Sequence, residues 1–355
     1  MPLSNPWLWF VIYFGLGLIL GTVLYRSDFC MAAILRDVFL FKDTARLRHL
    51  FLAVVLTLFL FLLLRAVGLS PADPYRGYGI VSLMGVGGGL IFGFGMVLAG
   101  GCVMSSLYKM ASGNLSYVLV FFGMILGSML YAELFPWLQE VERSLSLAMP
   151  ASLFELWPRA MRWVAWTFIA LAALLFVQWQ RKGYWHLRVE VAGYLQPWLA
   201  ALCLACISLA LYLFSSVPLG ISSGYAELAG FLGRMITPEH VASLEYFSRS
   251  EAMHLAEGRR YGEVVLMAGV VFGAFVNAVA LREFHVSPPP PLSQCGAAFA
   301  GGLLIALGAR MAQGCNFKHL LGGLPLLSVQ SLLFALGLIL GVWLGARILP
   351  RLLLR

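Results

Sequence analysis

A glycine-rich apolar segment that ends in a Gly-Cys pair occurs twice in this chain. The first copy is GGLIFGFGMVLAGGC (88–102) and the second is GGLLIALGARMAQGC (301–315). Aligned without a gap, the two copies share the Gly-Gly start, a central glycine, an alanine and the final Gly-Cys. Each is followed by a short polar stretch and then by a long apolar segment that contains GMILG (123–127) or GLILG (337–341). Such a repeat predicts two related halves, each with a cysteine at a helix break.

The composition places both halves in a membrane. The chain of 355 residues is 61% hydrophobic and 11% charged, whereas soluble domains are about 45–50% apolar and about 25% charged. The N-terminal stretch has no Lys or Arg before Arg26 and no small-residue cleavage site, so we expect a retained span rather than a signal peptide. The net charge of +8 fits arginines that face anionic lipid, and no pattern indicates a nucleic-acid partner.

The hydropathy pattern predicts an all-α polytopic membrane protein with about nine transmembrane helices, each about 20 residues long. The predicted spans are residues 7–25, 49–68, 81–99, 116–134, 162–180, 195–214, 264–281, 295–312 and 328–348. Three further apolar stretches, at 29–40, 103–111 and 316–323, are too short to cross the membrane. We expect short re-entrant helices there, which membranes tolerate where protein buries the polar backbone.

The repeat also predicts how the chain is divided. Residues 1–135 form a first half of four spans, residues 136–190 a linker with the fifth span, and residues 191–355 a second half of four spans. Because one linking span follows an even number of spans, the second half should be inverted about a pseudo-twofold axis in the membrane plane. The long loop 215–263 in the second half is expected to be an amphipathic surface excursion without visible chemistry.

The basic residues of the short loops predict the orientation. The loops 26–48 and 181–194 and the C-terminal tail are rich in Lys and Arg. The opposite set of loops is poorer in them once the long loop 215–263 is set aside, as the positive-inside rule requires for long loops. This predicts an N-terminus outside the cell and a C-terminus in the cytoplasm.

Cys102 and Cys315 each lie where a long helix ends and a short one begins. Free N–H groups and the helix dipole at such a start favour negative charge. An inverted repeat would aim two such starts at the membrane midplane, which creates an anion site without buried full charges. The alternative is a pair of tightly packed helix breaks with incidental cysteines, but duplication of the whole context favours a function. Small and polar neighbours would support the site: Gly100, Gly101, Gly314, Gln313 and Asn316.

The other candidate residues are less decisive. Local sequence leaves open whether Cys30 is functional or an inert buried thiol. Cys203 and Cys206 form a C-x-x-C in the middle of a span, where helix packing is the favoured explanation. Lys109 and Lys318 could attract an anion or extend to the membrane interface.

No metal-ligand spacing, Ser/His/Asp set or Walker motif is present in the sequence. We therefore expect no enzyme activity, no metal and no cofactor.

Four stretches resemble the YeeE/YedE family of bacterial inner-membrane proteins: RSDFCMAAILRD, FGFGMVLAGGCVMSSLYKMASGN, FGAFVNAVALREFHVSPPPP and ALGARMAQGCNFKHLLGG. Studied members of this family import thiosulfate. The resemblance implies an hourglass-shaped protein in which Cys30, Cys102 and Cys315 form a path. Their thiols would hydrogen-bond thiosulfate through its terminal sulfur and pass it inward. The resemblance also implies a cytoplasmic TusA-like sulfur-carrier protein as a partner.

The thiols suit this substrate, because a thiol is a soft, weak donor and thiosulfate has a soft terminal sulfur that sulfate lacks. The chain departs from the family pattern in two places. The stretch 103–106 has fewer glycines than is usual, and Gln313 stands where the first repeat has Gly100. Related paralogues are linked to selenium metabolism, so a selenium compound or another sulfur oxyanion is an alternative substrate. A membrane sulfurtransferase, in which one cysteine becomes a persulfide, is a further alternative.

Overall fold

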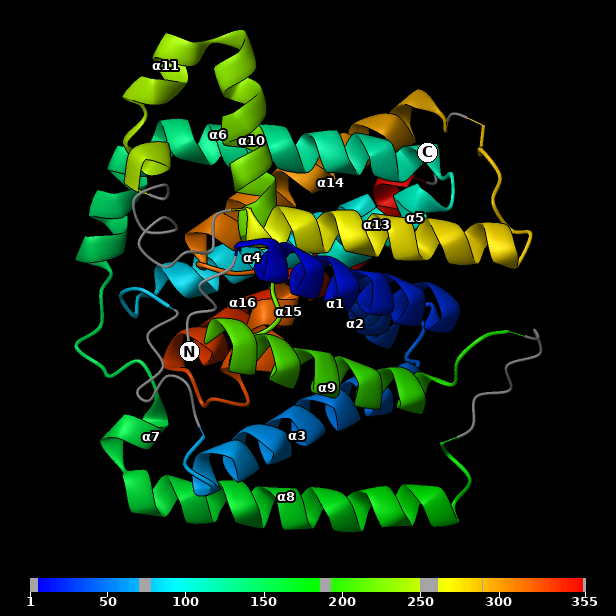
Figure 1. Cartoon of the computed structure of the whole chain (residues 1–355), viewed down its shortest axis with the longest axis vertical. Helices are drawn as coiled ribbons and strands as arrows, with labels where there is room; N and C mark the ends of the chain where they lie inside the picture. The colour runs from blue at the N-terminus through cyan, green and yellow to red at the C-terminus, as the bar shows by residue number, and fades with distance from the viewer. Residues whose placement is uncertain (1–5, 70–77, 186–192, 250–260, 289, 354–355) are drawn as a thin grey trace.

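The computed structural model describes residues 6–69, 78–185, 193–249, 261–288 and 290–353, which form helices joined by turns. Nine helical segments among them are long and apolar enough to cross a membrane, as the hydropathy pattern predicts. The long helices are α1 (Pro6–Ser27), α3 (Ala45–Ala66), α4 (Met84–Ala99), α6 (Leu115–Ser144), α8 (Pro158–Arg181), α9 (Pro197–Ser215), α13 (Gly262–Ala280), α14 (Leu292–Met311) and α16 (Val329–Leu353). Most of them run side by side across Figure 1.

Short helices lie between the long ones. They are α2 (Met31–Leu40), α5 (Val103–Ala111), α7 (Leu153–Leu156), α10 (Ser222–Ile236), α11 (Pro238–Ser243) and α15 (Asn316–Lys318), which continues into the π-helix η1 (His319–Gly323). The three short helices expected from the sequence are therefore present, as α2, α5 and α15 with η1. The helix α10 was not expected, and it crosses the long helices at a steep angle (Figure 1).

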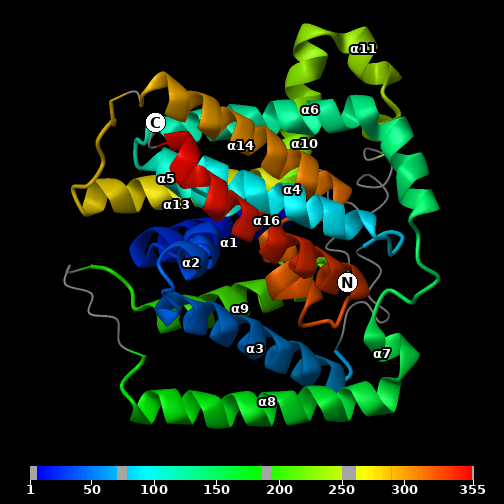
Figure 2. The same ribbon diagram turned by 180° about the vertical axis from the view of Figure 1, so that it is seen from behind.

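Glycine lets α4 and α14 approach each other backbone to backbone. A Cβ atom added to Gly88 would lie 2.8 Å from the backbone nitrogen of Ala312, and one added to Gly301 would lie 2.5 Å from that of Ala99. These two contacts are copies of each other, because the repeat aligns Gly88 with Gly301 and Ala99 with Ala312. Figure 2 shows α4, α14 and α16 crossing on this side of the molecule.

Matching contacts between the two repeats are also found farther from this helix pair. A Cβ atom on Gly123 of α6 would lie 3.1 Å from the nitrogen of Leu303 in α14, and one on Gly337 of α16 would lie 2.9 Å from that of Leu90 in α4. Further contacts come in matching pairs: α1 packs against α13 as α3 packs against α9, and α2 packs against α16 as α10 packs against α6. From this pairing we propose that the described parts of residues 1–135 and 191–355 are two halves related by a pseudo-twofold axis.

The prediction of a surface excursion at 215–263 is wrong for its first part. The helix α10 packs against α6, α13 and α14, and buries the side chains of Tyr225, Ala226 and Ala229. In the exchanged pairs α10 takes the place that α2 has in the first half. Residues 250–260 of this loop, and 186–190 of the linker, lie outside the described residues.

The fifth span, α8, lies along one edge of the molecule, where it contacts α3 and α7 (Figures 1 and 2). The linker thus stands beside the two halves rather than between them.

The glycine contact predicts the effect of one methyl group. We expect Gly88→Ala to lower the stability of the protein by about 1–3 kcal/mol, because the new Cβ meets backbone that cannot turn aside. Gly87 in the same helix has no atom within 4 Å of a Cβ, so Gly87→Ala should be neutral or slightly stabilising. Thermal unfolding of both variants in detergent tests this. Equal melting temperatures would show that the α4–α14 contact is not tight.

Candidate functional site

Each of the three cysteines singled out by the sequence caps the N-terminus of a short helix. Cys30 precedes α2, Cys102 precedes α5 and Cys315 precedes α15, all with extended backbone (φ −119°, −104° and −90°). All three side chains are buried and none forms a disulfide. The sequence predicted this position for Cys102 and Cys315 from the repeat and for Cys30 from the short apolar stretch 29–40, and the structure agrees for all three.

Cys30 and Cys102 are direct neighbours. Their side chains interact with each other, and α2 packs against α4, the helix that leads into Cys102. Ser105 fixes the second thiol, because its hydroxyl accepts from the backbone N–H of Cys102 (2.6 Å) and donates to the Cys102 sulfur (3.4 Å). Two thiols from different helices are thus held together without a covalent bond.

Cys315 is joined to this pair through two polar side chains. Tyr225 of α10 lies close enough to Cys102 and Cys315 to interact electrostatically with both, and its hydroxyl donates to the carbonyl oxygen of Val103 (3.1 Å). Asn316 donates from Nδ2 to the sulfur of Met31 (3.1 Å), the residue that follows Cys30. The starts of α2, α5 and α15 therefore belong to one buried cluster.

The two repeats keep the same backbone turn before the cysteine. Gly100 has φ +68° and Gln313, at the aligned position, has φ +65°. A left-handed glutamine is uncommon, and here its side-chain amide bonds the backbone N–H of Gly79 and the carboxylate of Glu142. The side chain of Gln313 thus anchors the turn, and it reaches loop 78–82 and α6 instead of the thiols.

The glycines next to Cys102 and Cys315 allow polar groups to approach the turn. A Cβ on Gly101 would lie 3.0 Å from the Ser105 hydroxyl, and one on Gly314 would lie 3.0 Å from Nε2 of His319.

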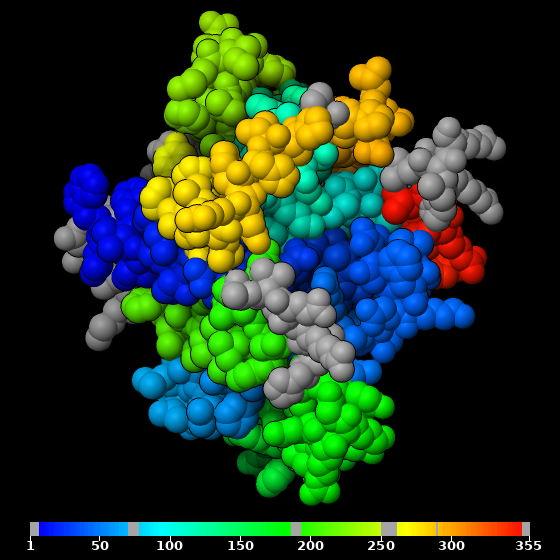
Figure 3. All heavy atoms as spheres, turned by 90° about the vertical axis from the view of Figure 1, so that its right-hand side faces the viewer, coloured from blue at the N-terminus to red at the C-terminus, as the bar shows by residue number. Residues whose placement is uncertain are grey.

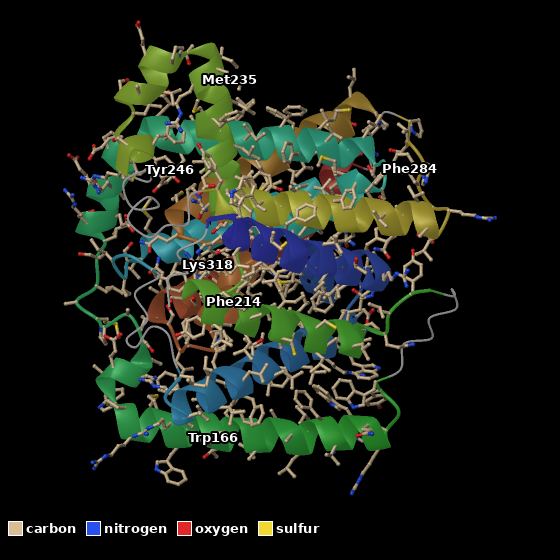
Figure 4. The ribbon with its side chains drawn as sticks, viewed as in Figure 1. Trp166, Phe214, Met235, Tyr246, Phe284 and Lys318 are labelled. Carbon is tan, nitrogen blue, oxygen red and sulfur yellow. The ribbon has the colours of Figure 1, made fainter. Side chains whose placement is uncertain are left out.

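A lysine reaches back to the turn in each half. Lys109 donates to the hydroxyl of Tyr117 (3.2 Å), which in turn donates to the carbonyl oxygen of Gly100 (3.0 Å). Lys318 donates directly to the carbonyl oxygen of Gln313 (3.0 Å). The sequence left open whether these lysines extend to the membrane interface, and the structure directs both ammonium groups toward the cysteine turns. Figure 4 places Lys318 on the same side of the molecule as Phe214 and opposite Phe284.

The start of α10 is held by charged groups that the sequence analysis missed. Arg310 of α14 donates to the hydroxyl of Ser222 (2.7 Å) and to that of Tyr246 (3.3 Å). The carboxylate of Glu263 accepts from the backbone N–H groups of Ser223 (2.7 Å) and Gly224 (3.1 Å). These contacts fix α10, and with it Tyr225. The small residues at helical spacing in SSGYAELAGFLG are the signal that could have indicated a packed helix here.

Figure 3 shows one face of the molecule, to which the residues that precede and follow α2 contribute. The start of α6, the segment after α13 and the residues around α2 gather there. Asp28 accepts from the Tyr108 hydroxyl (3.1 Å) and lies 3.7 Å from Arg46. Basic side chains from this part of the chain are Arg36, Lys42, Arg46, Arg48 and Arg282.

Among the described residues, no group of three or more His, Cys, Asp and Glu side chains has the geometry of a metal site. What the cluster offers a ligand is soft sulfur, helix starts and nearby ammonium groups. This is a setting for a small anion with a polarizable atom.

Comparison with known proteins agrees with a site for a small sulfur-containing anion. The sequence profile of the family described as "Sulphur transport" matches residues 26–344. The chain is 29% identical to a protein named "Thiosulfate transporter TsuA" from Spirochaeta thermophila, over 96% of this chain and 100% of the relative. It is 26% identical to the protein of the same name from Escherichia coli, over 92% and 91% of the two chains. A shorter match, 28% identical over 37% of this chain and 31% of the relative, is to "Probable transporter YedE" from Escherichia coli.

These matches confirm the resemblance to the YeeE/YedE proteins. With nine candidate spans and a profile match that runs through all three cysteines, the chain is a multi-pass membrane protein that belongs to the sulphur transport family.

Proposed function

We propose that this protein carries thiosulfate into a bacterial cell across the inner membrane, along a path of the thiols of Cys30, Cys102 and Cys315. The observation that carries the proposal is the burial of all three thiols in one cluster, each at the start of a short helix. The two relatives that match nearly the whole chain are named as thiosulfate transporters, which supports the choice of anion.

The chemistry of the cluster suits passage of this anion. Thiosulfate would present its outer sulfur to the thiols, which are weak S–H donors, and its charge to the N–H groups of the helix starts. Full charges would hold a divalent anion too tightly, whereas conduction needs sites that release as well as bind. The ammonium groups of Lys109 and Lys318 are tied to the turns beside the thiols and would add attraction without direct pairing.

The proposed orientation has a periplasmic N-terminus and a cytoplasmic C-terminus. The face shown in Figure 3 would then be cytoplasmic, and its basic residues agree with the positive-inside rule. A TusA-like sulfur carrier would receive the anion at this face. Consumption of thiosulfate in the cytoplasm would pull the uptake forward without an energy-converting site on this chain.

A membrane sulfurtransferase is the second candidate, and the contact between Cys30 and Cys102 favours it. One thiolate would attack the outer sulfur of thiosulfate, the S–S bond would break, and sulfite would leave with the electron pair. The cysteine would keep the transferred sulfur as a persulfide, which its neighbour could then accept or release.

The thiol path predicts that each of the three cysteines is needed. We expect Cys30→Ala, Cys102→Ala and Cys315→Ala each to lower thiosulfate uptake about tenfold or more, the effect of losing a hydrogen bond worth about 1.4 kcal/mol. Uptake of labelled thiosulfate by an uptake-deficient strain measures this, with Cys206→Ala as a control because that thiol is exposed on α9. Unchanged uptake by the Cys102 and Cys315 variants would remove the thiol path.

Mass spectrometry separates passage from covalent transfer. If the thiols only hold the anion, intact protein exposed to thiosulfate should show no added sulfur on Cys30, Cys102 or Cys315. A persulfide on one of them, lost when the protein is reduced, would favour the sulfurtransferase. In the same preparations, competition by selenite against labelled thiosulfate tests whether a selenium compound uses the path.

A further inference from the structure

The strongest unexplained feature of the cluster is the side chain of Asn316. It follows Cys315 directly and is fully buried, with 0% of its surface exposed. Its Oδ1 has no hydrogen-bond partner among the described residues. Its Nδ2 has Met31 Sδ as partner (3.1 Å), and a thioether sulfur is only a weak acceptor. One side of this amide is therefore unpaired, and the other is poorly paired.

Two buried polar groups that lie near Asn316 in the sequence or beside Cys102 do not share this property. His319, three residues along the chain, has the hydroxyl of Ser331 at one ring nitrogen (2.8 Å) and the carbonyl oxygen of Ala312 at the other (3.0 Å). Ser106 donates to the carbonyl oxygen of Cys102 (2.8 Å). Buried polar groups are normally satisfied in this way, so the amide of Asn316 needs a specific explanation.

Packing does not supply that explanation. The repeat aligns Asn316 with Val103, so the first half fills the equivalent position with an apolar side chain of similar size. A valine at 316 would avoid an unpaired polar atom in a place that water does not reach. The amide therefore makes sense if a polar ligand gives it a strong hydrogen-bond partner.

The amide also lies where a ligand on the thiol path must pass. It belongs to the residue after Cys315 and touches the residue after Cys30, so it connects two of the three thiol-bearing helix starts. A half-turn of the amide would direct both N–H groups to the position now held by Oδ1 and would place Oδ1 beside the Met31 sulfur. Because a thioether is a weak acceptor, the hydrogen bond lost in this turn is a weak one.

We propose that Asn316 is the residue that selects an oxyanion, by donating from Nδ2 to a sulfonate oxygen while the thiols hold the terminal sulfur. This inference rests on the proposed function and assigns the other end of the same substrate. Thiols alone would accept any soft sulfur species, including hydrosulfide, which has no oxygen. A site built to hydrogen-bond a substrate group discriminates strongly against an analogue that lacks it.

Two asparagine variants test the proposal against a purely structural role. Asn316→Val should bind thiosulfate about tenfold more weakly, while the ligand-free protein melts at the same temperature or higher, because an unpaired polar atom is removed. Asn277→Val is the matched control. That amide is buried in α13 and fully engaged with Arg26, Thr22 and the carbonyl oxygen of Gly273. Its loss should lower the melting temperature and leave thiosulfate affinity unchanged.

The measurement is a thiosulfate titration of thermal stability on purified protein, repeated with hydrosulfide under reducing conditions. Asn316→Asp, which keeps the shape but replaces the donor by a negative charge, should lose thiosulfate binding further, and Asn316→Ser should recover part of it. Hydrosulfide affinity should be the same in Asn316→Val as in the unmodified protein.

Three outcomes would overturn the inference. They are unchanged thiosulfate affinity in Asn316→Val, a melting temperature that falls together with affinity, and equal losses for thiosulfate and hydrosulfide. Failure of the unmodified protein to bind thiosulfate would instead count against the proposed function itself, so the two failures are distinguishable.

Discussion

The arrangement of the thiols depends on the backbone contact between α4 and α14. Lipid tails are as apolar as leucine, so helices in a membrane associate through close packing and not through a hydrophobic force. Gly88 and Gly301 remove the side chains that would separate these two helices. Both helices then end at a cysteine turn, and because Gly88 lies against Ala312 and Gly301 against Ala99, the register of this contact fixes where each turn lies along the partner helix.

Much of the fold could be predicted from the sequence, because an internal repeat can be recognised within a single chain. The nine spans follow from apolar length, and the short helices after Cys102 and Cys315 follow from stretches too short to cross. The left-handed turn is also visible, since Gly100 indicates it in one half. In the other half the aligned residue is Gln313, which does not indicate such a turn. The hydrogen bonds of its side chain offset the cost of a backbone conformation that glycine adopts freely.

The rest could not be predicted, because it arises from contacts between distant segments. The helix α10 lies in a loop with many acidic residues, and its apolar stripe looks the same whether it packs on protein or on a surface. Only the fold shows that Arg310 holds its start and that the Tyr225 hydroxyl donates to the carbonyl oxygen of Val103, the residue after Cys102. Cys30 has no copy in the repeat, so the family resemblance was needed to connect it with the other two.

The repeat explains why helices start at similar positions in the two halves, and the differences between its copies make the two sides of the site unequal. The start of α10 carries the buried Ile221 where its counterpart α2 carries Cys30, and the residue after the cysteine is Val103 in one half and Asn316 in the other. Two identical halves would hold an anion equally well on both sides of the midplane. On the proposed path an anion would meet unequal partners as it crosses, because one half supplies two thiols and the other a thiol with an amide. Conduction through several sites requires that no single site hold its ion too tightly. Because the two halves are unequal, the affinity of each site can be limited independently of the others.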